Sequence, residues 1–143
     1  MNFSMEISPK TDLSTLPNLK DVYITFLPGG NYKETADKAG ELVKKGFNPI
    51  PHFPARSITN SAQLKEYVLR CKDAGVKQVL VIGGSREPVG DFESSIQLLE
   101  TGYFEDMKIG IAGHPEGSPD ISDSVLEKAM QDKKPYADYI VTQ

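Results

Sequence analysis

Six short apolar segments recur along the chain, and stretches with helical spacing separate them. The last five are rich in Val, Ile, Phe or Tyr and are followed by Gly, Pro or polar residues, as expected of strands buried on both faces. Strands that alternate with helices about every 30 residues predict βαβ units and a mainly parallel sheet. The predicted strands are Phe3–Ser8, Asp21–Leu27, Asn48–Phe53, Gln78–Ile82, Lys108–Ala112 and Tyr139–Thr142.

Helical spacing is clearest between Asn60 and Gly75, where an Asn and a Gly suit the two ends of a helix. The connection 9–20 contains regularly spaced leucines but also Pro17, which predicts a short helix or an irregular turn. Ser124 and Glu127 form a capping box that predicts a further helix. The predicted buried stripes are Leu64, Tyr67, Val68 and Cys71; Ala36, Ala39, Gly40 and Val43; and Phe92, Ile96 and Leu99.

Composition excludes several classes of protein. The chain has 143 residues, 38% of them hydrophobic, and a single cysteine, which predicts one globular domain without a disulfide framework. The formal charge of -4 and the absence of Lys/Arg clusters argue against nucleic acid as a partner. No apolar run is long enough to span a bilayer and the N-terminus does not resemble a secretory signal, so we expect a cytoplasmic protein with no membrane partner.

Two architectures fit this alternation of strands and helices. A doubly wound open sheet closes at this length, whereas a (β/α)8 barrel needs eight strands and typically about 250 residues. Length alone therefore favours the open sheet. In both architectures, ligands bind beyond the carboxyl ends of the strands, so the residues at those ends are the candidates for function.

Both histidines of the chain, His52 and His114, fall at predicted strand ends. A single such histidine is more often structural, but two of two favour a shared site. Glu6 lies inside an apolar strand, where a carboxylate is tolerated at a solvent-facing edge or in a cleft suited to general acid chemistry. Metal binding is not expected, because the sequence has neither a second cysteine nor a His-x-x-x-His spacing.

Phosphate-binding motifs are weak. Gly83-Gly84-Ser85 follows a predicted strand, but neither the G-x-G-x-x-G fingerprint nor a G-x-x-x-x-G-K-[ST] loop is present. An open-sheet nucleotide-binding domain therefore rests on length and strand alternation alone. The G-x-S-x-G motif of hydrolases with a serine nucleophile is also absent.

Taken in order, the strand ends resemble the catalytic domain of the methylenetetrahydrofolate reductase family. Met5-Glu6-Ile7-Ser8-Pro9 is similar to the family's F-E-F-x-P segment, and Val22-Tyr23-Ile24-Thr25 to its V-S-V-T strand. Pro51-His52-Phe53 is similar to P-H-L, and Ile140-Val141-Thr142-Gln143 to I-x-T-Q. The most specific segment is 110–119, Gly-Ile-Ala-Gly-His-Pro-Glu-Gly-Ser-Pro, which resembles G-x-A-G-Y-P-E-G-H-P.

This resemblance implies a (β/α)8 barrel that reduces 5,10-methylenetetrahydrofolate to 5-methyltetrahydrofolate, with FAD as cofactor and NAD(P)H as hydride donor. Glu6 matches the family's general acid, and Gln143 matches a glutamine that contacts the folate substrate. Ser85 stands where the family has an Asp near the flavin, which suggests a divergent branch. The positions that match the surroundings of the flavin are Thr25, His52, Ser85, Phe92, Ala112, His114 and Ser118.

The family continues through two more strands, so the resemblance implies that 1–143 is the N-terminal portion of such a barrel, with about six of its parallel strands. An open piece of this kind has unpaired edge strands, which predicts a longer protein or association with itself or another chain. The leading hypothesis is therefore a flavin-dependent oxidoreductase of one-carbon metabolism. The alternative is a non-catalytic barrel portion that acts as a folate- or flavin-binding or oligomeric interaction module.

Overall fold

The structure is a computed structural model that describes residues 4–17, 20–27, 30–83, 87–113 and 134–142. All six predicted strands are confirmed, with their ends displaced by no more than a few residues. The strands are β1 (Ser4–Ile7), β2 (Asp21–Ile24), β3 (Asn48–Pro54), β4 (Gln78–Ile82), β5 (Lys108–Gly113) and β6 (Tyr139–Thr142).

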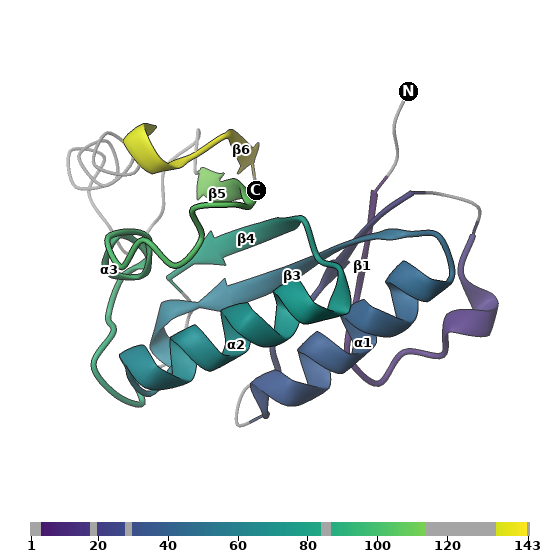
Figure 1. Cartoon of the computed structure of the whole chain (residues 1–143), viewed down its shortest axis with the longest axis horizontal. Helices are drawn as coiled ribbons and strands as arrows, with labels where there is room; N and C mark the ends of the chain where they lie inside the picture. Colours follow the sequence, from purple (N-terminus) through teal and green to yellow (C-terminus); the bar gives the residue numbers. More distant parts are fainter. Residues whose placement is uncertain (1–3, 18–19, 28–29, 84–86, 114–133, 143) are drawn as a thin grey trace.

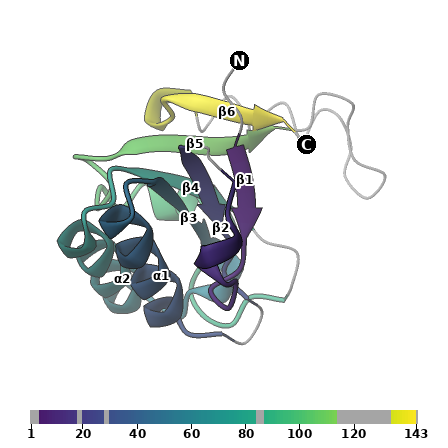
Figure 2. The same ribbon diagram turned by 90° about the vertical axis from the view of Figure 1, so that its right-hand side faces the viewer.

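The six strands form one parallel sheet in the order β1-β2-β3-β4-β5-β6. A doubly wound sheet reverses its strand order at a switch point, and this sheet does not. Figure 2 shows the strands turning progressively, so that β6 crosses the view while β1 and β2 run steeply. The doubly wound arrangement that length alone favoured is therefore wrong, and the sheet is a curled half-barrel of the α/β class.

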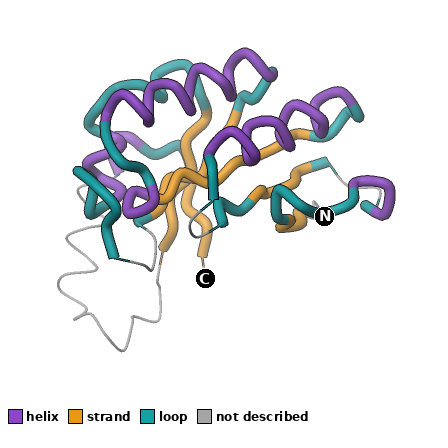
Figure 3. Tube along the Cα trace, turned by 90° about the horizontal axis from the view of Figure 1, so that it is seen from below, coloured by secondary structure: helices purple, strands orange, loops and turns teal. Residues whose placement is uncertain are grey.

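Helices α1 (Tyr32–Lys44), α2 (Ser61–Ala74) and α3 (Ser95–Leu99) lie on one face of the sheet (Figures 1 and 3). The Asn60 side chain caps α2, which ends at Gly75 with a φ of 97°, a conformation that favours glycine. The expected short helix in 9–20 is the 3-10 turn Leu13–Thr15, and two further 3-10 turns span Ala55–Ser57 and Lys134–Tyr136. The helix predicted at Ser124 and Glu127 lies outside the described residues.

The main hydrophobic core lies between the sheet and these helices. Alternate strand residues point toward the helices, among them Val22, Ile24 and Val79, which are fully buried. The stripe predicted for α2 is confirmed, because all four of its residues are buried. The stripe predicted for α1 is partly wrong. Thr35 and Leu42 are buried instead of Gly40 and Val43, which are only half-buried.

The strand residues between these point to the opposite, concave face of the curled sheet. At the amino ends of the strands this face carries a polar row, in which the Asn48 Nδ2 donates to Asp21 Oδ1 at 3.1 Å and to Gln78 Oε1 at 3.0 Å. Asp21, Asn48 and Gln78 are the first residues of β2, β3 and β4. The row therefore ties together three neighbouring strands.

Tyr139 crosses the concave face from β6 over β5. Gly110 is its register partner, and a Cβ placed on Gly110 would overlap the Tyr139 ring. The Lys108 Nζ lies 5.3 Å from the centroid of the same ring, within the range of a cation–π contact. Glycine is therefore required at position 110 so that the tyrosine can lie flat across the strand.

None of the described helices combines the length and the apolar character needed to cross a bilayer.

We predict that Gly110→Ala lowers the free energy of unfolding by about 1–3 kcal/mol, because the added methyl group displaces the Tyr139 ring. Urea denaturation followed by circular dichroism measures this loss. Gly83→Ala is the matched control, since a Cβ there meets no atom within 4 Å. Adding Tyr139→Ala to Gly110→Ala should make the two losses less than additive, and full additivity would contradict the proposed overlap.

Candidate functional site on the concave face

Four of the predicted site residues share the concave face. Glu6 on β1 and His52 on β3 point to it by strand alternation, and Ala112 on β5 is paired with Val141 of β6 on the same face. Thr25 continues the ladder of β2, because its N–H donates to the Ile7 carbonyl at 2.8 Å. The structure thus brings together residues from four strands, all in the carboxyl-terminal parts of those strands.

His52 and Glu6 interact electrostatically across β2. Burial lowers the pKa of His52 below its ordinary value of 6.5, and the negative charge of Glu6 opposes this by raising it. Glu6 itself is exposed on the edge strand. Of the two alternatives left open by the sequence, the solvent-facing edge position is the one that the structure shows.

Each of these two side chains can exchange protons. An exposed carboxyl group can exchange protons with solvent, and a partly buried imidazole that favours its neutral form offers one donor and one acceptor nitrogen. Thr25 and Ala112 contribute small side chains to the same face and are both half-buried.

Two buried residues of the helices donate hydrogen bonds to the backbone of the site residues on the sheet. The Tyr67 hydroxyl on α2 donates to the His52 carbonyl at 2.8 Å, and the Thr35 hydroxyl on α1 donates to the Thr25 carbonyl at 3.3 Å. Tyr67 is fully buried and Thr35 is 1% exposed. Sequence reasoning placed Tyr67 in an apolar stripe and overlooked Thr35, because neither hydrogen bond leaves a signal in local spacing.

The Tyr67 ring also belongs to an aromatic cluster behind β3. It stacks on Phe53 with ring centroids 3.9 Å apart, and Phe53 meets Phe104 edge-on at 5.0 Å. Phe26 and Tyr32 contact the other sides of Tyr67 at 5.9 and 5.7 Å. The strand that carries His52 is thus packed against a rigid aromatic support.

The remaining predicted site residues do not join this group. Phe92 is 7% exposed and belongs to the hydrophobic core between the sheet and the helices. Ser85, His114, Ser118 and Gln143 lie outside the described residues.

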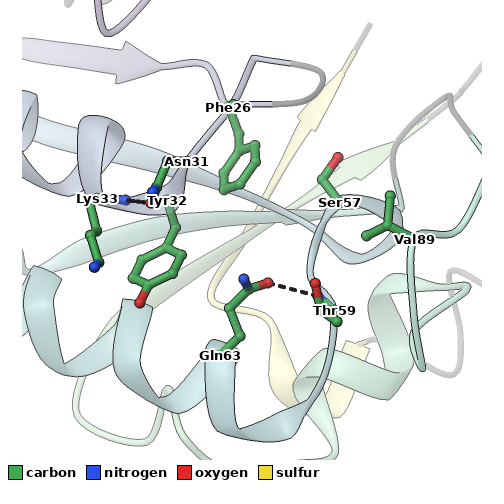
Figure 4. Close-up of a pocket in the computed structure, with 9 residues that line it drawn as sticks. Phe26, Asn31, Tyr32, Lys33, Ser57, Thr59, Gln63 and Val89 are labelled. Atoms are coloured by element: carbon green, nitrogen blue, oxygen red, sulfur yellow. Dashed lines mark hydrogen bonds between the residues drawn. The ribbon is translucent and has the colours of Figure 1, made fainter.

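A separate cleft of about 420 Å³ opens where the loops after β2, β3 and β4 meet the first turns of α1 and α2. Figure 4 shows Phe26 and Tyr32 on one side of it and Ser57, Thr59 and Val89 on the other. Gln63 lies at its base, where its Oε1 accepts a hydrogen bond from the Thr59 N–H at 2.7 Å. None of the predicted site residues that the structure describes lines this cleft, which sequence reasoning did not find.

The described part of the chain contains no group of three or more His, Cys, Asp or Glu side chains arranged to hold a metal ion. No protein-family model matches the chain.

We predict that Tyr67→Phe lowers the free energy of unfolding by about 1–2 kcal/mol, because it removes the hydrogen bond to the His52 carbonyl while keeping the stacked ring. Chemical denaturation measures the loss. Tyr103→Phe is the matched control, since it removes an exposed hydroxyl contact with Ser61 and should cost less than about 0.5 kcal/mol. Equal losses in the two variants would show that the buried bond contributes nothing specific.

We also predict that Glu6→Gln lowers the pKa of His52 further, because the favourable charge is lost while the burial remains. The chain has two histidines, so NMR titration of the imidazole Cε1–Hε1 signals resolves them, and a His114→Gln variant assigns them. Glu105→Gln, which alters a carboxylate beside α2, should leave the His52 pKa unchanged. A rise in the His52 pKa of the Glu6 variant would contradict the interaction.

Proposed function

We propose that the concave face is the active site of a flavin-dependent reductase of the methylenetetrahydrofolate reductase type, built on a (β/α)8 barrel. The observation that carries the proposal is the convergence of Glu6, Thr25, His52 and Ala112 on one face, near the carboxyl ends of parallel strands. These residues were selected by resemblance of separate sequence segments. Their common location supports a shared role, because barrel enzymes bind their ligands at this end.

The residues present suit a flavin. Ala112 and Thr25 carry small side chains, and a neutral His52 imidazole can hydrogen-bond to the polar edge of a ring system. When bound, FAD would accept hydride from NAD(P)H and deliver it to the folate. The supporting feature within the chain is the fixed backbone at Thr25 and His52, which Thr35 and Tyr67 hold from the helix layer.

In this proposal Glu6 is the proton donor to 5,10-methylenetetrahydrofolate. Opening of the five-membered ring of the folate requires a proton on the leaving nitrogen, and an exposed carboxyl group on the concave face can supply it and be reprotonated from solvent. In this proposal His52 hydrogen-bonds to the ring system, and the negative charge of Glu6 acts on its imidazole. The product is 5-methyltetrahydrofolate.

The proposal predicts a yellow protein and two separable half-reactions. Added FAD should be retained with flavin absorbance, and NAD(P)H should be oxidised with menadione as the electron acceptor. Glu6→Gln should leave this NAD(P)H oxidation nearly intact while it slows methylenetetrahydrofolate reduction by about 10²-fold or more, because the proton donor acts only on the folate.

Stopped-flow absorbance of the flavin measures both half-reactions, with Glu105→Gln as the control that alters neither. An equal loss in both half-reactions would rule out Glu6 as the proton donor. A colourless protein that binds no added FAD would contradict the flavin proposal itself.

The second candidate is a non-catalytic interaction module, which the edges of the sheet favour. β1 and β6 end the strand order, and Ile140 on β6 is 46% exposed although it is a large apolar residue. Exposed strand edges are sites for pairing with another chain. A colourless protein that sediments as a stable dimer would favour this module over the reductase.

A further inference from the structure

Tyr23 lies on the concave face between Glu6 and His52. It is the register partner of Glu6 on β1 and of Ile50 on β3, and His52 is two residues beyond Ile50 on the same face. The ring centroids of Tyr23 and His52 are 6.2 Å apart and the rings meet edge-on, at an interplanar angle of 65°. Tyr23 was not among the residues selected from the sequence.

The side chain of His52 has few other restraints. The His52 carbonyl accepts a hydrogen bond from the Tyr67 hydroxyl. Among the described residues, no hydrogen bond to the His52 imidazole accompanies it. The groups that act on the imidazole are the Tyr23 ring from β2 and the Glu6 charge from β1. The neighbour on β4 is Leu80, which is uncharged and 3% exposed.

Tyr23 also lies beside Tyr139 on the concave face. The Tyr139 hydroxyl is buried there beside Tyr23 and Gln78, without a hydrogen bond of good geometry to any described residue. Burial is the main cause that raises the pKa of Tyr139, and Tyr23 and Asp21 add to it. The two tyrosines come from β2 and β6, which three strands separate, and they meet because the sheet curls.

We propose that Tyr23 is a positioning residue whose ring edge fixes the orientation of the His52 imidazole relative to the Glu6 carboxylate. Aromatic rings favour this edge-to-face geometry over free rotation past each other. A fixed imidazole keeps one separation from Glu6, so the electrostatic effect of Glu6 on His52 is not averaged over several imidazole orientations. The inference rests on the proposed function only for its meaning in the reaction, since the arrangement of Glu6, Tyr23 and His52 belongs to the protein without ligand.

A double-mutant cycle on the His52 pKa tests this directly. The coupling is the change in the His52 pKa that Glu6→Gln causes, measured by NMR titration of the imidazole signals. Tyr23→Phe keeps the ring and should keep the coupling. Tyr23→Leu keeps apolar volume without a ring edge and should reduce the coupling to less than about half of its original value.

A purely space-filling role for the Tyr23 ring would give a different result in this cycle. If Tyr23 only fills space, Tyr23→Leu lowers the melting temperature and leaves the coupling unchanged, which overturns the proposal. Loss of coupling in Tyr23→Phe also overturns it, because the Tyr23 hydroxyl and not the ring would then be responsible. Where circular dichroism shows that Tyr23→Leu is unfolded, Tyr23→Met takes its place, since methionine adapts to irregular apolar space.

The same measurements separate this inference from the proposed function. They require neither flavin nor folate, so a protein that binds no FAD contradicts the reductase and leaves the coupling result unaffected. A protein that binds FAD but shows equal coupling in the native and Tyr23→Leu forms contradicts only the role of Tyr23.

Discussion

The hydrogen bond from the Tyr67 hydroxyl to the His52 carbonyl is the constraint on which the site depends. A fully buried tyrosine needs a partner for its hydroxyl, and here the partner belongs to a strand and not to solvent. The bond fixes how far α2 can slide along β3. Because the His52 side chain leaves the same residue on the opposite face, the position of a helix on one side of the sheet determines the position of an imidazole on the other.

The two faces of the sheet therefore differ in composition. The helix side contains the apolar residues whose burial stabilises the fold, each fully buried Val, Leu or Ile contributing about 1.5–3 kcal/mol before entropy is counted. The concave side carries Glu6, Tyr23 and His52, whose polarity would be costly in that core. Residues on the concave side can vary in chemistry without loss of the main core, so one sheet can combine an apolar face with a polar one.

Much of the fold follows from the sequence, because strands buried in a parallel sheet leave continuous apolar runs with polar or glycine ends. The α2 stripe and its Asn60 cap were also predictable, since both depend on local spacing. The buried stripe of α1 differs from the predicted one in part because Thr35 is buried and donates a hydrogen bond to the carbonyl of Thr25, ten residues earlier. From the sequence alone, a polar residue with such a distant partner looks like a surface residue. Strand order could not be read from length, which favoured the wrong architecture.

The site was predictable to a smaller extent. Resemblance selected Glu6, Thr25, His52 and Ala112, and strand alternation explains why they share a face. It also selected Phe92, whose side chain lies in the core, because a short motif does not distinguish an aromatic residue that packs from one that lines a site. Tyr23 and Tyr67 were not selected as site residues, since their contacts join elements far apart in the chain.

The side chain of Asn48 has a consequence for strand registration. Its single amide nitrogen uses both hydrogens, one on Asp21 of β2 and one on Gln78 of β4. A slip of one residue in either strand would replace the acceptor by a lysine or a valine, neither of which can accept a hydrogen bond, and would reverse the faces of the strand. One amide thus fixes the register of three strands. The relative positions of the side chains at their carboxyl ends therefore depend on a contact at their amino ends.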